Sequence, residues 1–169
     1  MEITGYKLRA AIQNWTLIRE TAVSQFKGSL RKFKGEDKYP PDVVMKDIRE
    51  AEEFVARLQT AQARYNLDVM IDVEDARMSL CQAVKMIGGA GRIANLWKDA
   101  THEGGTRDMF GKHTFHRDKD DEYAERTITV EDALRGASEA QQFFTALRAA
   151  VAQGNAEKRD IEGLTPELF

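Results

Sequence analysis

The residues from Gly104 to Arg117 have the types and spacing that come closest to a phosphate-binding loop. They read GGTRDMFGKHTFHR. In a loop of the form G-x-x-x-x-G-K-[ST], backbone N–H groups and the lysine hold phosphates, and the hydroxyl after the lysine binds Mg²⁺. Here five residues separate Gly105 from Gly111, and Lys112 is followed by a histidine. A helical pattern also precedes the stretch, whereas such a loop follows a buried strand. These departures argue against an NTPase.

The histidines of the same region suggest a metal site. His113 and His116 have the H-x-x-H spacing that can chelate a metal from one helical turn, and His102, Asp118 and Asp120 are close in sequence. Zinc sites, however, hold their ligands on rigid elements with supporting hydrogen bonds, and no regular element is predicted here. We therefore expect no metal and no cofactor, and we interpret the histidines as solvated or phosphate-facing.

No pattern for nucleophilic or acid–base catalysis is present. Cys81 is the only cysteine and lies in a predicted helix, where it is most simply a small packing residue. No G-x-S-x-G elbow occurs, and the adjacent acidic pairs Glu52/Glu53 and Asp120/Asp121 are typical of a solvated surface. We expect a protein that is not an enzyme.

The glycine cluster in IGGAGRIANLW allows two interpretations. Gly88, Gly89 and Gly91 each cost about 1 kcal/mol relative to Ala inside a helix, so the helix either breaks here or is closely crossed by another element. A break would let backbone N–H groups, with the helix restarting at Arg92, hold an anion. A close crossing would leave Arg92 solvated.

The segment 103–126 has no usable period and combines cationic with aromatic residues. Arginine and histidine donate hydrogen bonds to phosphates, and aromatic and guanidinium planes stack on bases. Seven acidic residues share the segment, so a solvated connector is the alternative interpretation. The candidate binding residues for a small anion are Arg92, Trp97, Arg107, Phe110, Lys112, His113, Phe115, His116, Arg117 and Arg126.

The net charge of −3 is unevenly distributed along the chain. Residues 1–34 hold seven Lys/Arg and two Glu, a balance of +5 that leaves −8 for the remainder. A basic amphipathic helix can contact nucleic acid, but it can equally pack beside an acidic helix, which we favour because the cations are spread along it. No apolar run approaches the roughly 18 residues of a membrane span, and no secretory signal begins the chain. We expect a cytoplasmic protein without membrane contact.

Hydrophobic periodicity predicts a mainly α-helical chain. We expect helices at about 6–33, 41–65, 76–101 and 131–153, the last capped by Thr129 and stopped by Gly154. Asp75 would cap the third helix. Apolar and polar residues alternate over 67–73, which predicts a strand. Residues 127–130 alternate weakly and can pair with this strand to form a short two-stranded β element.

The helices are expected to form one domain over residues 1–155. Apolar residues from Val44 to Tyr65 recur at steps of four and three, the spacing of a coiled-coil seam. We therefore expect long antiparallel helical hairpins in a coiled-coil-like bundle, assembled as a homo-oligomer because one chain leaves seams uncovered. The tail 156–169 is expected to be partly ordered, and Leu168 and Phe169 can dock on a neighbour.

The order of parts resembles the septicolysin-like family of small helical bacterial and phage proteins, whose biochemical role is not established. The resemblance rests on KLRAAI in the first helix, an acidic proline-bearing break, AQARYN ending the second helix, MSLCQAV and NLWKDA in the third, and TITVEDAL opening the last. The glycine cluster and the long 103–122 stretch depart from the family's plainer helix–loop–helix. The resemblance implies an oligomeric helical fold and supplies no active-site residues.

These observations favour a non-enzymatic, oligomeric binding protein for a small anionic, nucleotide-derived ligand. Small phage proteins that sequester immune nucleotide signals share this format, so phage anti-defence sequestration is one hypothesis, by analogy alone. The alternatives are an adaptor that contacts other proteins through its coiled-coil-like helices and, more weakly, nucleic-acid binding through the basic first helix. The sequence does not distinguish these by itself.

Overall fold

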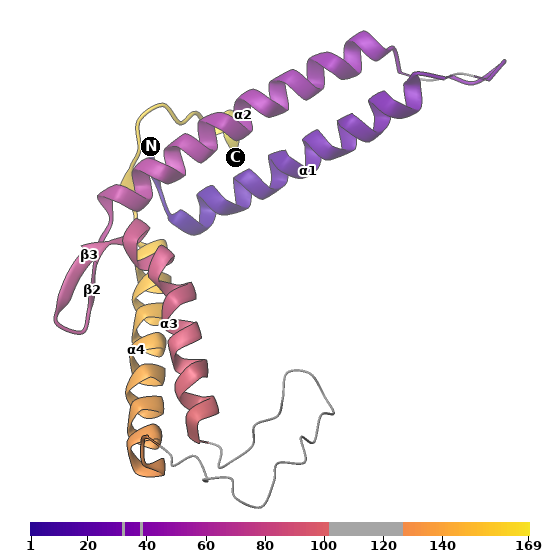
Figure 1. Cartoon of the computed structure of the whole chain (residues 1–169). Coiled ribbons are helices and arrows are strands. Elements are labelled where there is room, and N and C mark those ends of the chain that lie inside the picture. Colours follow the sequence, from indigo (N-terminus) through magenta and orange to yellow (C-terminus); the bar gives the residue numbers. More distant parts are fainter. Residues whose placement is uncertain (32, 38, 102–126) are drawn as a thin grey trace, which may run out of the picture. The chain divides into compact units, whose positions relative to one another are not determined.

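The structure is a computed structural model that describes residues 1–31, 33–37, 39–101 and 127–169. It is mainly helical, as expected, and the described residues include four α-helices (Figure 1). The chain divides into two compact units. The first unit comprises residues 1–84 and 149–169, and the second comprises residues 85–148. Each unit is considered separately below.

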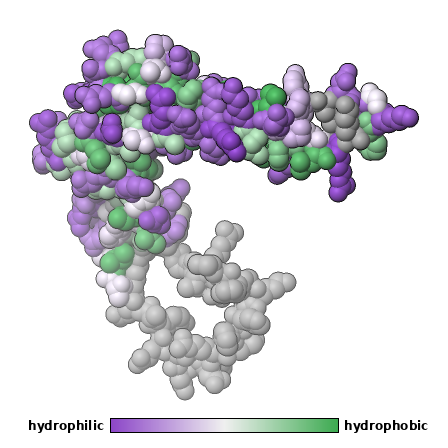
Figure 2. All heavy atoms as spheres, turned by 90° about the horizontal axis from the view of Figure 1, so that it is seen from above, coloured by the Kyte–Doolittle hydropathy of each residue, from purple (hydrophilic) through white to green (hydrophobic). Residues whose placement is uncertain are grey.

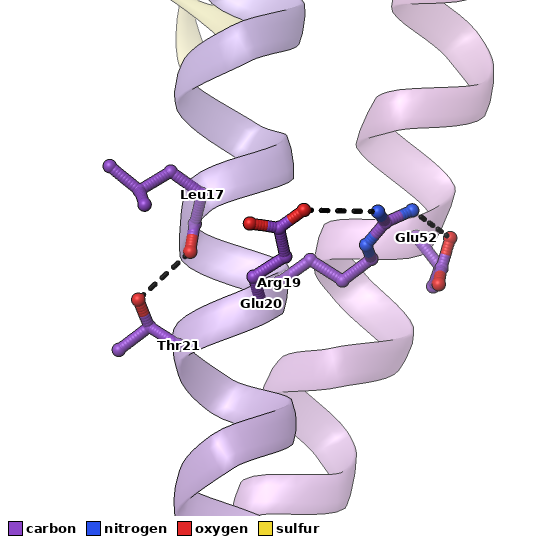
Figure 3. A network of polar contacts seen from close by, with 5 residues as sticks. All are labelled: Leu17, Arg19, Glu20, Thr21 and Glu52. Carbon is purple, nitrogen blue, oxygen red and sulfur yellow. Dashed lines mark hydrogen bonds and ion pairs between the residues drawn. The ribbon is translucent and has the colours of Figure 1, made fainter.

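Two long helices pack against each other in the first unit. Helix α1 spans Gly5–Ser29 and helix α2 spans Pro41–Asp68. The rings of Trp15 and Phe54 meet edge to face with centroids 4.6 Å apart, and a guanidinium nitrogen of Arg19 lies 3.4 Å from a carboxylate oxygen of Glu52 (Figure 3). As the residue number rises along α1 it falls along α2, so the two helices run antiparallel.

The sequence explains where these helices begin. The Thr4 hydroxyl accepts a hydrogen bond from the Lys7 amide at 3.2 Å and caps α1, while Pro41 begins α2, where its missing N–H costs nothing. Their shared core contains fully buried Leu8 and Leu58. Helix α1 ends at Ser29, four residues before the expected end, and α2 continues three residues beyond Tyr65.

The β element differs from the expected pairing. Strand β2 (Met70–Val73) pairs antiparallel with β3 (Ala76–Ser79), not with residues 127–130, which lie just before the last helix and at its first residue. Glu74 has a φ of 51° and forms the turn with Asp75, so Asp75 is not a helix cap. Ser79 caps the third helix instead, because its hydroxyl accepts from the Gln82 amide at 3.2 Å. Helix α3 therefore spans Leu80–Thr101 rather than beginning at 76.

The last helix, α4, spans Val130–Ala156 and begins with the expected Thr129 cap. The Thr129 hydroxyl accepts from the Asp132 amide at 3.0 Å and donates to the Asp132 carboxylate at 2.6 Å. This hydrogen bond from Thr129, with the nearby Arg135 cation, lowers the pKa of Asp132. Gly154 does not stop the helix as expected. It lies inside α4, where a Cβ would come within 2.7 Å of Ile71 Cγ2.

The tail that follows α4 is folded onto its own chain. Strand β4 (Arg159–Asp160) pairs antiparallel with β1 (Glu2–Ile3), and a short 3-10 helix, η1, spans Pro166–Leu168. Leu168 is fully buried, and its carbonyl accepts a hydrogen bond from Trp15 Nε1 at 3.0 Å. The expectation of a partly ordered tail docking through Leu168 on a neighbour is therefore replaced by packing within the first unit.

Tyr65 joins α2 to the end of α4. Its side chain is fully buried, and its hydroxyl lies 2.6 Å from the Gly154 carbonyl oxygen and 2.7 Å from that of Glu157. Burial raises the pKa of the Tyr65 phenol above its ordinary value of 10.0, and the Glu157 carboxylate adds to this effect. The contact requires a small neighbour, since a Cβ on Gly5 would lie 2.8 Å from Tyr65 Cε1.

Replacing Tyr65 by Phe is expected to lower the free energy of unfolding by about 1–3 kcal/mol, because the buried hydroxyl that donates to the carbonyl groups of Gly154 and Glu157 is lost. Tyr6→Phe is the matched control: the Tyr6 hydroxyl donates to the Ala152 carbonyl at 3.2 Å, but that side chain is 50% exposed. Urea unfolding followed by circular dichroism measures both variants. Equal losses in the two variants would contradict this role for Tyr65.

The stabilisation from Tyr65 is expected to depend on pH at the alkaline end. Because the pKa is raised in the folded state, the contribution is fully present below about pH 10 and is lost as pH rises through the folded pKa. The difference in unfolding free energy between the wild type and Tyr65→Phe should therefore be constant up to about pH 9 and shrink as the pH rises above about 10. A difference that stays constant over this range would show that the phenol does not titrate differently on unfolding.

Candidate functional site

Most of the expected binding residues lie outside the described residues. These are Arg107, Phe110, Lys112, His113, Phe115, His116, Arg117 and Arg126, all within 102–126. The structure describes Arg92 and Trp97, both on α3 in the second unit. The candidate site can therefore be built only from the two helices to which segment 102–126 is connected.

Helix α3 is continuous through its glycine cluster. Residues 88–91 lie inside the helix, so the turn expected to present free backbone N–H groups at Arg92 is not formed. The close-crossing interpretation holds for Gly91, since a Cβ there would lie 3.3 Å from Phe144 Cε2. Arg148 in turn places its guanidinium 5.6 Å from the centre of the Phe144 ring. Arg92 is exposed on the same helix, as that interpretation requires.

Trp97 packs on α4 rather than standing free. A Cβ on Gly136 would lie 2.6 Å from Trp97 Cδ2 and 2.7 Å from Cε3, so the indole lies directly on the backbone of Gly136. This contact uses part of the indole surface that a ligand at a candidate binding residue would need. Together with Gly91 and Phe144, it makes Trp97 part of the packing that holds α3 and α4 side by side (Figure 1).

Large apolar side chains remain exposed on this helix pair. Leu96 is 68%, Leu134 56% and Ile93 52% exposed. Scattered apolar residues are ordinary on protein surfaces, but neighbouring ones on one element mark a contact site. Ile93 and Leu96 lie one helical turn apart on α3, so they form such a neighbouring pair.

A separate cavity of about 350 Å³ lies in the first unit, between α2 and the tail. Arg57, Thr60 and Arg64 line it from α2, and Glu162 and Gly163 line it from the tail. Arg57 donates to the Gly163 carbonyl at 3.1 Å, which holds its guanidinium at the rim. Sequence reasoning missed this cavity because the tail was not expected to fold back, although the three α2 residues share one helical face.

The basic helix α1 is partly neutralised by its own neighbour. Arg19 lies 4.0 Å from Glu20 and 3.4 Å from Glu52 of α2, and the three side chains form the network in Figure 3. Such exposed pairs contribute about 0–1 kcal/mol of stability, but they reduce the charge available to nucleic acid. This arrangement favours the interpretation that α1 packs beside an acidic helix. The surface over α1 and α2 is mostly polar, with apolar patches among the polar side chains (Figure 2).

Two further features limit the chemistry of the described residues. Among residues 1–31, 33–37, 39–101 and 127–169, no group of three His, Cys, Asp or Glu side chains could hold a metal ion. In the same part of the chain, no helix is both long enough and apolar enough to cross a membrane. The three histidines all lie in 102–126, outside this part.

Comparison with known proteins found no match: no family model, no curated protein and no solved structure is similar to the chain. The resemblance to the septicolysin-like family therefore stays a prediction.

The contact between Trp97 and Gly136 is directly testable. Gly136→Ala is expected to destabilise the protein, because a Cβ would overlap the indole and overpacking of this kind costs about 1–3 kcal/mol, more than the helix propensity gained. Gly88→Ala is the control, since its Cβ would meet only Arg92 Nη1 at 3.6 Å, and it should be neutral or stabilising by up to about 1 kcal/mol. Thermal unfolding measures both, and a stabilised Gly136→Ala variant would contradict the packing.

Proposed function

We propose that this protein is a non-catalytic, homo-oligomeric binding protein. The observation that carries the proposal is the exposed apolar surface of the α3–α4 pair, where Leu96, Leu134 and Ile93 remain more than half exposed. Two helices cannot bury apolar side chains on all their sides, so further copies of the chain would cover the remainder. Oligomerisation through these helices would place more than one copy of segment 102–126 in each assembly.

The ligand we propose is a small, anionic, nucleotide-derived molecule held by segment 103–126. The support comes from the residue types in the segment, where arginine, lysine and histidine can hold phosphates and Phe110 or Phe115 can stack on a base. Arg92 is compatible with this role because it is exposed on α3. Trp97 is a less favourable candidate because its indole already covers Gly136.

Capture without turnover fits the absence of a catalytic pattern from the sequence. A protein that binds a signalling nucleotide tightly lowers its free concentration by mass action, without needing a nucleophile or a general base. Sequestration of immune nucleotides by a phage protein in the cytoplasm is the biological setting that this format suggests, by analogy.

The alternative is an adaptor that contacts other proteins. It is favoured by the connection between α1 and α2, where Phe33 is 77%, Tyr39 70% and Leu30 62% exposed. Exposed aromatic residues are enriched at protein interfaces, so this end of the first unit is the surface such a partner would contact. The adaptor would need no small ligand.

A thermal-shift screen separates the two functions. We expect cyclic dinucleotides or ADP-ribose derivatives to raise the melting temperature, with a stabilisation of about 2.7 kcal/mol at a ligand concentration one hundred times the Kd. The Arg107→Ala/Arg117→Ala double variant should lose this shift. The Arg9→Ala/Arg49→Ala double variant, which removes two exposed cations from α1 and α2, is the matched control and should keep it.

No shift with any of these ligands in the wild type would reject the nucleotide proposal and leave the adaptor. A shift that survives Arg107→Ala/Arg117→Ala would place the ligand elsewhere, and the cavity beside Arg57 and Arg64 would then be the next position to test by substitution.

A further inference from the structure

Helix α3 carries a second apolar row beside the one that packs on α4. The packed row includes Ala90 and Ala94, which are 6% and 7% exposed. The second row, spaced three, four and three residues apart, consists of Met86, Gly89, Ile93 and Leu96. With 3.6 residues per turn, the two rows are turned from each other by about 100°. The second row therefore lies on the side of α3 and not against α4, which agrees with the high exposure of Ile93 and Leu96.

We propose that this second row is a self-complementary interface, on which α3 of one copy packs antiparallel against α3 of a second copy. The pairing places a two-fold axis between Gly89 and Ile93. It rests on the proposed oligomerisation and deepens it, because it names the surface, the partner and the relative direction of the two helices.

The sizes of the side chains favour this direction. In the antiparallel register, Ile93 lies opposite Gly89 of the second copy, and Met86 lies opposite Leu96. A Cβ built on Gly89 meets nothing within 4 Å, so the space above this glycine is open to a large neighbour. In a parallel pair, Gly89 would face Gly89 and leave a gap that close-packed interfaces avoid. In the antiparallel register, the Ile93 side chain of each copy fills the space above Gly89 of the other.

The charges beside the row favour the same direction. Lys85, Arg92 and Asp99 follow one another at seven-residue spacing along the edge of the second row. In the antiparallel pair, Lys85 of each copy lies near Asp99 of the other, which gives two attractive contacts against one repulsive contact between the two Arg92 side chains. Lys85 and Asp99 cannot pair within one chain, because fourteen residues of helix separate them by about 21 Å.

The apolar contact is tested by sedimentation velocity of the full chain over a range of concentrations. Leu96→Glu should raise the dissociation constant of the oligomer at least about tenfold, because a carboxylate would be buried in the row. Leu17→Glu is the matched control, since Leu17 is 62% exposed on α1, compared with 68% for Leu96. The control should associate like the wild type.

The direction of the pair is tested by charge reversal. Lys85→Glu alone and Asp99→Lys alone should each weaken association about three- to tenfold, through repulsion between the copies. The double variant Lys85→Glu/Asp99→Lys should restore wild-type association, because the attraction is re-formed with its signs exchanged. Single variants that weaken association without rescue in the double variant would overturn the antiparallel register.

The outcomes also separate this inference from the function it rests on. If the wild type associates but Leu96→Glu associates equally well, α3 is not the interface, while oligomeric binding stands. If the wild type is monomeric at all concentrations, both the interface and the homo-oligomer are rejected. Circular dichroism of Leu96→Glu and Leu17→Glu should show the same helical content, because both changes lie on exposed positions.

Discussion

The first unit depends on the contact that the Tyr65 phenol makes with the end of α4. Its hydroxyl reaches the carbonyl oxygens of Gly154 and Glu157, 89 and 92 residues away in sequence. A buried phenol must find such partners, because an unsatisfied hydroxyl in an apolar core costs several times more than the hydrogen bond contributes. The contact fixes where α4 meets α2, and the β1–β4 pair then holds the two chain ends beside it.

Small residues make this arrangement and the α3–α4 pair possible. Gly5 and Gly154 let α1 and α4 approach the Tyr65 ring and the β2 strand, and Gly91 and Gly136 give room to Phe144 and Trp97. In each case the glycine lies inside or at the start of a helix, where its low helix propensity reduces stability. The packing of a large side chain on the glycine backbone offsets this loss. Gly89 on α3 has open space instead, and the proposed α3 interface would fill it with Ile93 of a second copy.

Periodicity was sufficient to predict the helices, because an apolar row at steps of three and four is visible within a single segment. Periodicity could not predict the β2–β3 pair, because Asp75 is suited both to a helix cap and to a turn. The positive φ of Glu74 shows that the turn is formed. Periodicity also could not predict the tail. The Leu168 carbonyl accepts a hydrogen bond from Trp15, which lies 153 residues earlier, and such long-range contacts leave no local pattern. For the candidate site, sequence supplied the residue types, and the structure altered the roles of Gly91 and Trp97.

The proposed function involves two parts of the chain, the exposed row on α3 and the sequence segment that follows it, which is rich in cationic and aromatic residues. The two parts are physically independent, since copies would associate through the row whether or not the segment binds a ligand. The two parts are adjacent in sequence, because α3 ends at Thr101 and the segment begins at the next residue. In the proposed antiparallel pair the two segments would begin at opposite ends of the α3 helices, about 30 Å apart, so each segment would bind its ligand separately.

Hydrogen–deuterium exchange at two protein concentrations tests the proposed association of copies through α3. Backbone amides of residues 86–96 are expected to exchange more slowly in the concentrated sample, while those of residues 8–22 in α1 should exchange at the same rate in both. Equal exchange of the α3 amides at concentrations where the protein is associated would contradict the proposed interface.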